Sequence, residues 1–297
     1  MDKLYSPAIA RKIIDKYGFH ISKSLGQNFL TDGNIVDRII HGAGIGKQDL
    51  VIEVGPGMGV LTAAAAEQAQ QVIGIEIDEN LIPILRETLK DYQNVRIVNG
   101  DFLKMNLAEL IDEASTGSRE RFESVKLIGN LPYYITSPII MKVLEEGQGA
   151  QGIQSLTIMM QKEVADRIRA VPGTKAYGAL SVAVQYYCTV EVVATVSKEV
   201  FLPKPKVDST VLNLSVRKEP PVKLLDPATF FAVVKAGFGQ RRKTLLNSLT
   251  GLYGMDKQQI LALLETAGID PGRRAETLGL DEFAVMANLV SKAVSEA

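Results

Sequence analysis

The sequence predicts an α/β protein with a largely parallel sheet, followed by a small all-α C-terminal domain. Short β-rich runs recur between residues 50 and 216, and helical stretches separate the first of these runs. This alternation is typical of a parallel sheet with helices packed on its faces. After the adjacent prolines Pro220 and Pro221 the strand pattern stops, and from about Ala228 every apolar repeat has a helical period.

The elements of the first part can be assigned in chain order. Four β-rich runs occur, at 49–55, 71–78, 95–101 and 125–130, and the stretches 61–70 and 79–92 have the composition of helices between the first three. A fifth apolar run, 155–161, leads into a charged helix, and 189–197 and 209–217 are expected to close the sheet as an antiparallel pair. We therefore predict two domains, 1–217, with a separate N-terminal segment over about 1–48, and 218–297.

Composition excludes several classes of protein. The 297 residues carry 33 Lys and Arg against 34 Asp and Glu, which argues against nonspecific coating of nucleic acid but allows a local basic face. Cys188 is the single cysteine, and His20 and His41 are the only imidazoles, so neither a disulfide nor a metal site is expected. The N-terminus lacks the apolar core of a signal peptide, and no stretch resembles a membrane span. We expect a soluble, cytoplasmic protein.

Glycines gather where the first predicted strand meets the Ala-rich helix, in VIEVGPGMGVLT. Gly55, Gly57 and Gly59 would let a ligand approach the backbone and the helix N-terminus. The dinucleotide fingerprint would place its third glycine at Val60, and no Gly-Lys-Ser/Thr phosphate cradle is present. Taken alone, this loop could be an ordinary tight turn.

Acidic residues end the next two predicted strands. Glu76 is placed to accept hydrogen bonds from two ribose hydroxyls, and Asp101 from an adenine amino group. Either could instead cap a helix. Open α/β sheets bind ligands beyond the carboxyl ends of their strands, so ligand-type residues at three successive strand ends favour one site. A ribose clamp without a diphosphate loop fits a nucleoside that lacks phosphates, of which S-adenosylmethionine is the common example.

The stretch GNLPYY follows the fourth strand, beside the same crevice. Proline has no N–H, so nearby carbonyls must find partners outside a ladder. The Asn130 side chain and the Leu131 carbonyl, before Pro132, could accept both N–H groups of an adenine amine, and Tyr133 could stack on the base. The sulfonium methyl is already activated, so positioning and electrostatics can supply most of the catalysis. The alternative interpretation is a polar turn after a strand.

Together these motifs resemble a known family. KSLGQNFL, IEVGPGMGVLT, GIEID, NGDFL, GNLPYYITSPII and FLPKPKVDSTVL are similar, in order and spacing, to the bacterial small-subunit rRNA adenine dimethyltransferases, the KsgA/RsmA family. The resemblance covers nearly the whole chain and implies a Rossmann-like S-adenosylmethionine-dependent methyltransferase sheet. It also implies transfer of two methyl groups to N6 of each of two adjacent adenosines, in the hairpin near the 3′ end of 16S rRNA, during small-subunit assembly.

The resemblance assigns roles to individual residues. Asn28 and Leu30 would close over the methionine part of S-adenosylmethionine, and the rest of the cofactor site would comprise Gly55, Gly57, Glu76, Asp101 and Asn130. Phe201 would face Tyr133 across the target base, although it could equally anchor the chain in the core where a strand begins.

Basic residues are candidates for binding RNA phosphates. They occur in three short stretches and are Lys204, Lys206, Arg241, Arg242, Lys243, Arg273 and Arg274. A solvated helix face is the usual meaning of such runs. Two other classes of function stay open: an Erm-type enzyme acting on large-subunit rRNA, and a ribosome-assembly or transcription factor that keeps the fold without the activity. The intact Glu76, Asp101 and Asn130 set argues against the last, and the KSLGQNFL start argues against the Erm type.

Overall fold

The computed structural model describes residues 4–22, 24–118, 121–146, 152–240 and 242–296. The chain divides into two compact units. The first comprises Met1–Ala165 and Val190–Val216, and the second comprises Asp166–Thr189 and Arg217–Ala297. Among the described residues no helix is both long and apolar enough to cross a membrane.

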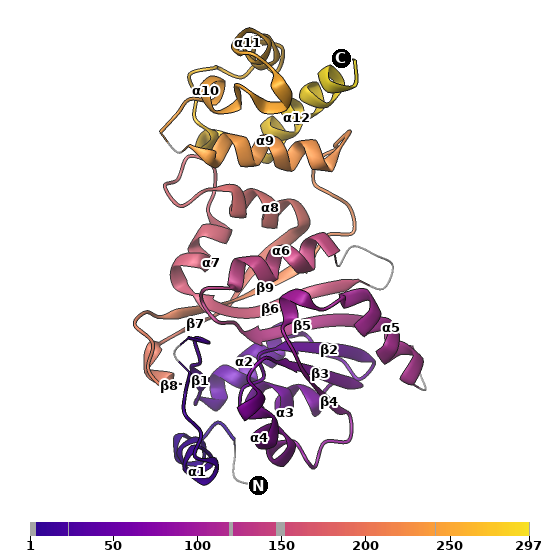
Figure 1. Ribbon diagram of the computed structural model, residues 1–297, viewed down its shortest axis with the longest axis vertical. Coiled ribbons are helices and arrows are strands. Elements are labelled where there is room, and N and C mark those ends of the chain that lie inside the picture. Colours follow the sequence, from indigo (N-terminus) through magenta and orange to yellow (C-terminus); the bar gives the residue numbers. More distant parts are fainter. Residues whose placement is uncertain (1–3, 23, 119–120, 147–151, 241, 297) are drawn as a thin grey trace. The chain divides into compact units, whose positions relative to one another are not determined.

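A seven-stranded sheet forms the first unit, in the order β4-β3-β2-β5-β6-β9-β7 (Figure 1). Its strands are β2 (Asp49–Val54), β3 (Gln71–Glu76), β4 (Val95–Asn99), β5 (Ser124–Asn130), β6 (Ile153–Gln161), β7 (Cys188–Val196) and β9 (Ser209–Val216). The first five are parallel to their neighbours, and β9 runs antiparallel to β6. The predicted α/β fold class is confirmed.

Helices cover both faces of this sheet, as right-handed crossovers require. On one face lie α2 (Gly33–Ala43), α3 (Val60–Ala66) and α4 (Ile82–Thr88), and on the other α5 (Leu107–Gly117) and α6 (Thr136–Glu146) (Figure 1). The central strands are therefore buried on both sides, and Leu50, Val51 and Ile52 are fully inaccessible.

The backbones of β2 and β5 lie so close together that position 129 requires glycine. A Cβ atom on Gly129 would lie 2.9 Å from the carbonyl oxygen of Val54. This glycine precedes Asn130, the last residue of β5. Close packing of the two central strands thus fixes where the GNLPYY turn leaves the sheet.

The N-terminal segment forms α1 (Pro7–Tyr17), the short strand β1 (Phe29–Leu30) and α2. Strand β1 pairs antiparallel with β8 (Phe201–Leu202) in a separate two-stranded ribbon, with Leu30 opposite Phe201. This ribbon cannot be predicted from the local sequence, because strands of two residues are too short to show an alternating hydrophobic pattern. It brings together segments about 170 residues apart in the chain.

The second unit is helical. It contains α8 (Ala179–Tyr187), α9 (Pro227–Gly239), α10 (Leu245–Leu249), α11 (Lys257–Thr266) and α12 (Leu280–Ser295), while α7 (Lys162–Arg169) and β7 span the division between the units. Its core includes Phe230 and Phe283, both fully buried, and Tyr186 packs against Phe230 with ring centroids 5.3 Å apart. Residues 166–189, which the predicted boundary at 217/218 placed with the sheet, share this core with the C-terminal helices.

Candidate active site

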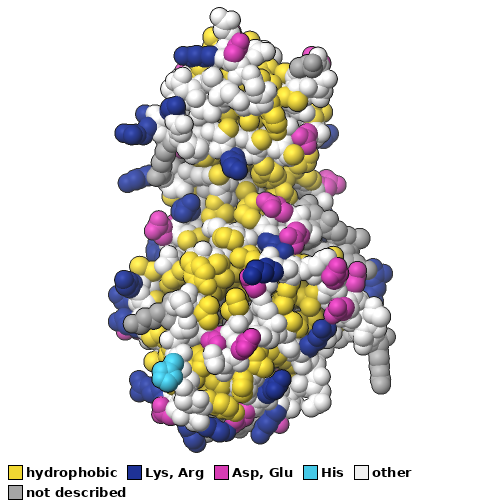
Figure 2. Space-filling view, viewed as in Figure 1, with side chains coloured by type: hydrophobic (Ala, Val, Ile, Leu, Met, Phe, Trp, Pro, Cys, Tyr) yellow, Lys and Arg dark blue, Asp and Glu magenta, His cyan; other side chains and the backbone are white. Residues whose placement is uncertain are grey.

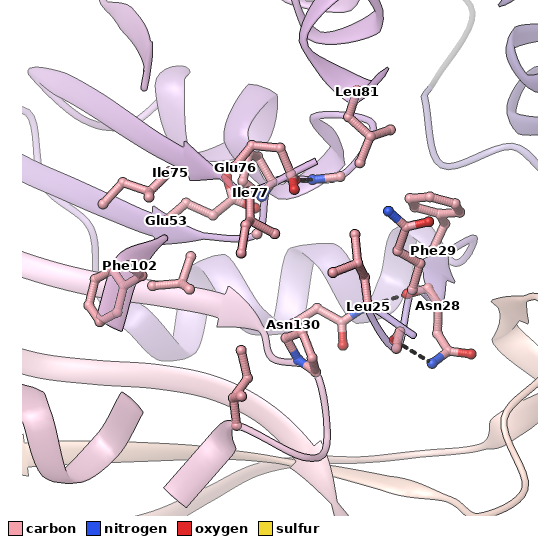
Figure 3. A pocket seen from close by; sticks show the side chains of 18 of the residues that line it. Leu25, Asn28, Phe29, Glu53, Ile75, Glu76, Ile77, Leu81, Phe102 and Asn130 are labelled. Carbon is pink, nitrogen blue, oxygen red and sulfur yellow. Dashed lines mark hydrogen bonds between the residues drawn. The ribbon is translucent and has the colours of Figure 1, made fainter. Parts of the chain in front are cut away.

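A pocket lies at the carboxyl ends of β2, β3, β4 and β5, where the parallel strands end at one edge of the sheet. Residues 25–30, which we call the strap, form part of its wall. The structure places all seven predicted cofactor residues in its lining: Asn28, Leu30, Gly55, Gly57, Glu76, Asp101 and Asn130. Figure 3 shows Asn130 beside Asn28, with Glu53 and Glu76 on the neighbouring strands.

The glycine loop between β2 and α3 leaves the room that a ligand needs. Gly55 has φ 69° and Gly57 φ 61°, a left-handed conformation that favours glycine. A Cβ atom at Gly55 would meet nothing within 4 Å, so a guest can approach this backbone closely. A Cβ atom at Gly57 would lie 3.2 Å from the ring of Phe29 in the strap.

Glu76 presents a buried carboxyl group at the end of β3. The side chain is 4% exposed, and it accepts hydrogen bonds from the N–H of Gly57 at 3.1 Å and of Asp78 at 2.9 Å. Burial raises its pKa. Both carboxylate oxygens are hydrogen-bond acceptors in the pocket lining, so the group fits ribose hydroxyls.

Asp101 and three apolar residues suit the flat base of a nucleoside. One oxygen of Asp101 accepts from the N–H of Leu103 at 3.0 Å, and the other lies 3.7 Å from the Lys104 ammonium. Ile77, Phe102 and Leu103 line the same part of the pocket, and Ile77 is 49% exposed despite its apolar side chain. This carboxylate acceptor and these apolar walls fit an adenosine group.

The side-chain amide of Asn130 is held in one orientation. Its nitrogen donates to the main-chain carbonyl of Asn28 at 2.7 Å, a bond drawn in Figure 3. The Asn28 amide nitrogen in turn donates to the Gly26 carbonyl at 3.0 Å. With its nitrogen committed to the strap, Asn130 can offer its side-chain oxygen as an acceptor for an incoming amine.

The residues after Asn130 form a compact turn. Leu131 is buried and donates its N–H to the Met159 carbonyl at 3.1 Å, while the Pro132 carbonyl accepts from the N–H of Ile135 at 3.1 Å. Pro132 lines the pocket, whereas Leu131 and Tyr133 are not part of its lining. The half-buried Tyr133 has its hydroxyl 3.0 Å from that of Ser209, and burial raises its pKa.

Phe201 lies in the hydrophobic core. It is 5% exposed and belongs to the same buried cluster as Val36 and as Leu30, its partner in the ribbon of β1 and β8. It is not part of the pocket lining. This placement agrees with the alternative role given above, an anchor where the chain enters a strand.

The predicted phosphate contacts fall into two groups. Lys204 pairs with Glu199, and Arg273 is held by both oxygens of Glu282 and by Thr277, so their donors already have partners. Lys206, Arg242, Lys243 and Arg274 have exposed side chains. Arg241 lies outside the described residues. The main-chain N–H of Leu245 donates to the Arg273 carbonyl at 2.7 Å, so the segments carrying Arg242, Lys243 and Arg274 lie side by side.

Sequence reasoning missed three residues around this pocket. Glu53 is a carboxyl group that directly follows the buried apolar run 50–52 of strand β2, which is itself a signal of function. Ile77 follows the strand-end acid directly, but nothing in the sequence marks it as exposed. Gln27 stands next to Asn28 in the strap, and only its tertiary contacts distinguish it.

The chain is similar to known proteins over nearly its whole length. The family described as "Ribosomal RNA adenine dimethylase" matches residues 18–292. Proteins named "Ribosomal RNA small subunit methyltransferase A" are 50% identical over 295 residues in Clostridioides difficile and 52% identical over 292 in Alkaliphilus metalliredigens. These matches cover 99% and 98% of this chain, and 99% of each relative.

Two solved structures share the fold. A dimethyladenosine transferase from Plasmodium falciparum has a TM-score of 0.71 and 25% identity, over 87% of this chain and 95% of that one. The 23S rRNA methyltransferase ErmE has a TM-score of 0.64 and 28% identity, over 89% of this chain and 99% of that one. With the family match spanning nearly all of both units, the chain belongs to the ribosomal RNA adenine dimethylase family.

Proposed function

We propose that this protein, an S-adenosylmethionine-dependent rRNA adenine dimethylase, acts on the hairpin near the 3′ end of 16S rRNA. It transfers two methyl groups to N6 of each of two adjacent adenosines within the immature small subunit. The names of the relatives that are 50% and 52% identical support this choice of ribosomal subunit. We further propose that it works as a cytoplasmic monomer.

The orientation of Asn130 is the observation that supports the chemistry. Its amide nitrogen is fixed on the Asn28 carbonyl, so its oxygen is available at the pocket edge. An oxygen there, with the Leu131 carbonyl, can accept the two N–H groups of an adenine amine and favour a pyramidal nitrogen. The adenosine would have to turn out of its stack to reach this point.

The chain's own residues supply positioning. The bound cofactor supplies a methyl group on a sulfonium, which makes it electrophilic. Glu76 would hold the ribose, Asp101 the adenine of the cofactor, and Tyr133 would stack on the target base with its ring fixed by Ser209. The N6 nitrogen forms the new bond as the carbon–sulfur bond breaks, and its surplus proton leaves to solvent, so no dedicated base is required.

The exposed residues Arg242, Lys243 and Arg274 support a role for the second unit in binding rRNA. They lie on two adjacent segments joined by main-chain hydrogen bonds. Arg241, which lies outside the described residues, stays a predicted phosphate contact, and we assign Lys206 to a separate contact from the first unit. Lys204 and Arg273 have internal partners and are weaker candidates.

A second candidate is methylation of large-subunit rRNA, because the ErmE structure is 28% identical over 89% of the chain. One assay separates the two substrates. The protein is incubated with labelled cofactor and either unmethylated small subunits or protein-free 23S rRNA, and the modified bases are mapped. We expect label on two adjacent adenosines of 16S rRNA. Label on 23S rRNA alone would establish the second candidate instead.

A further inference from the structure

We propose that Gln27 is a positioning residue that couples the ribose end of the cofactor site to Asn130. Its two amide atoms have different partners. Its oxygen accepts from the main-chain N–H of Ser22 at 2.7 Å, and its nitrogen donates to a carboxylate oxygen of Asp78 at 2.6 Å. The inference rests on the proposed function, because it concerns how Asn130 is oriented for the acceptor amine.

Asp78 is a firm attachment point for this contact. It is 7% exposed, and its other carboxylate oxygen accepts from the N–H of Asn80 at 3.0 Å. Its own N–H donates to Glu76, the proposed ribose ligand. Asp78 does not line the pocket, so Gln27 is joined to the frame of the ribose site without competing for the ligand.

The strap connects Gln27 to Asn130. The residue after Gln27 is Asn28, whose carbonyl receives the Asn130 amide nitrogen. On the same side, a Cβ atom on Gly26 would lie 3.4 Å from Pro132 and 3.5 Å from the Tyr134 ring, so the strap packs directly on the GNLPYY turn. Gln27 therefore connects two parts of the site. On one side it binds Asp78, which is bonded to Glu76, and on the other side its neighbours in the strap contact the GNLPYY turn.

The second end of the strap is held independently. Phe29 and Leu30 pair with Leu202 and Phe201 in the β1–β8 ribbon. Without Gln27 the ribbon would still retain the strap, but the Asn28 carbonyl would no longer be held in position to accept the hydrogen bond from the Asn130 amide. The Asn130 amide would then rotate, and its oxygen would no longer be the atom presented to the amine.

Gln27→Ala tests this coupling. At saturating cofactor and small subunit, we expect the single-turnover methylation rate to fall on the order of 10- to 100-fold, as misplacing a positioned group does. Gln258→Ala, which removes an exposed glutamine in the second unit, is the matched control and should leave the rate unchanged. Full recovery of the rate at saturating cofactor would show a binding effect only and overturn the proposal.

A polarity exchange tests the contact itself. Gln27→Glu sets two carboxylates together, and Asp78→Asn sets an amide N–H against a donor, so each single change should slow methylation. In the double variant the new amide donates to the new carboxylate, and the N–H groups of Ser22 and Asn80 keep their acceptors. We expect recovery to within a few-fold of wild type. A double variant no better than the worse single variant would contradict the contact's role.

A readout without catalysis keeps this inference separate from the proposed function. The Asn130 side-chain amide resonance, assigned by its loss in Asn130→Ala, should shift in Gln27→Ala and return in the double variant. An unchanged resonance would overturn the coupling even if wild type methylates 16S rRNA. Absence of methyl transfer by wild type would refute the proposed function, and the resonance would still decide the role of Gln27.

Discussion

At the scale of single residues, Asn130 is central because its two amide atoms have different tasks. The nitrogen donates to the Asn28 carbonyl, which leaves the oxygen for the substrate amine that we propose it binds. An aspartate could not replace it, since a carboxylate would face that carbonyl with no proton to donate. The site therefore depends on an amide rather than on a charge.

Replacing Asn130 should reduce chemistry more than binding. For Asn130→Ala we expect a single-turnover rate lower on the order of 100- to 1000-fold, the usual cost of losing one preorganised hydrogen-bonding group at a reacting centre. Saturating cofactor separates this from a cofactor-binding defect. Asn34→Ala, which removes an exposed asparagine in the first turn of α2 and outside the pocket lining, is the control. A rate within a few-fold of wild type would return GNLPYY to the status of a turn.

Glu53 is the second residue with an unusual environment. It is 1% exposed, lines the pocket, and accepts a hydrogen bond from the Thr62 hydroxyl at 2.5 Å, which ties β2 to α3. Burial raises its pKa from 4.5 to about 8, and the nearby Glu76 carboxylate adds to the rise. The folded protein therefore keeps a proton there that the unfolded chain releases at lower pH.

This retained proton predicts a pH dependence of stability. Between pH 4.5 and about 8 the folded state binds more protons than the unfolded state, so the Glu53 contribution to stability falls as pH rises. In Glu53→Gln the side-chain oxygen still accepts the hydrogen bond from the Thr62 hydroxyl, but the side chain no longer titrates. Its free energy of unfolding, relative to wild type, should rise by up to about 1.4 kcal/mol per pH unit across this window. Urea unfolding at pH 5.5 and 8 measures it, and a difference independent of pH would refute the assignment.

At the scale of elements, two short segments of the second unit create its basic surface. Main-chain hydrogen bonds run from Leu245 to the Arg273 carbonyl and from Leu246 to the Pro271 carbonyl. These bonds hold the residues before α10 beside the turn before α12. Arg273 has a structural task at this junction, because Glu282 binds both ends of its guanidinium, and its neighbour Arg274 is left exposed.

The exposed basic residues of these two segments predict a salt-dependent contribution to RNA binding. Arg242→Ala, Lys243→Ala and Arg274→Ala together should weaken small-subunit binding and lower its salt slope by about 0.7 to 0.9 per lost phosphate contact, with cofactor affinity unchanged. Replacing the exposed lysines Lys223, Lys257 and Lys292 with alanine is the charge-matched control. Equal salt slopes for the two triple variants would reduce the cluster to a solvated surface.

At the scale of the whole molecule, the second unit is assembled from two separate stretches of chain. Helix α8 and the C-terminal helices share one apolar core, in which Tyr186 contacts both Phe230 and Phe231. A cut at the predicted boundary would leave Val182 and Tyr186 without the partners that bury them. The division of the chain into functional parts at 217/218 stays a prediction.

Truncation to residues 1–217 tests this interdependence. Because α8 would expose apolar side chains, we expect the fragment to bind a hydrophobic dye strongly and to aggregate, and to lose near-UV signal from Tyr177 and Tyr186. Dye fluorescence, analytical ultracentrifugation and near-UV circular dichroism measure these three effects. A monomeric fragment with the tyrosine signal of the intact protein would show that α8 packs without the C-terminal helices.

The sheet and seven residues of the pocket lining were predictable from the sequence alone. Four residues lie at or just after the ends of the strands around the site, namely Gly55, Glu76, Asp101 and Asn130, and parallel strands must bring such ends to one edge. Strand periodicity and strand-end residues are local properties, so they can be read without coordinates.

Long-range packing determines where the remaining candidates lie. Phe201 lies in the core beside Leu30, which is distant in the chain, and Arg273 forms an ion pair with Glu282, nine residues further along. Gln27 gained its contact with Asp78 across 51 residues of sequence in the same way. Contacts of this range depend on how elements pack, and packing leaves no pattern in the local sequence.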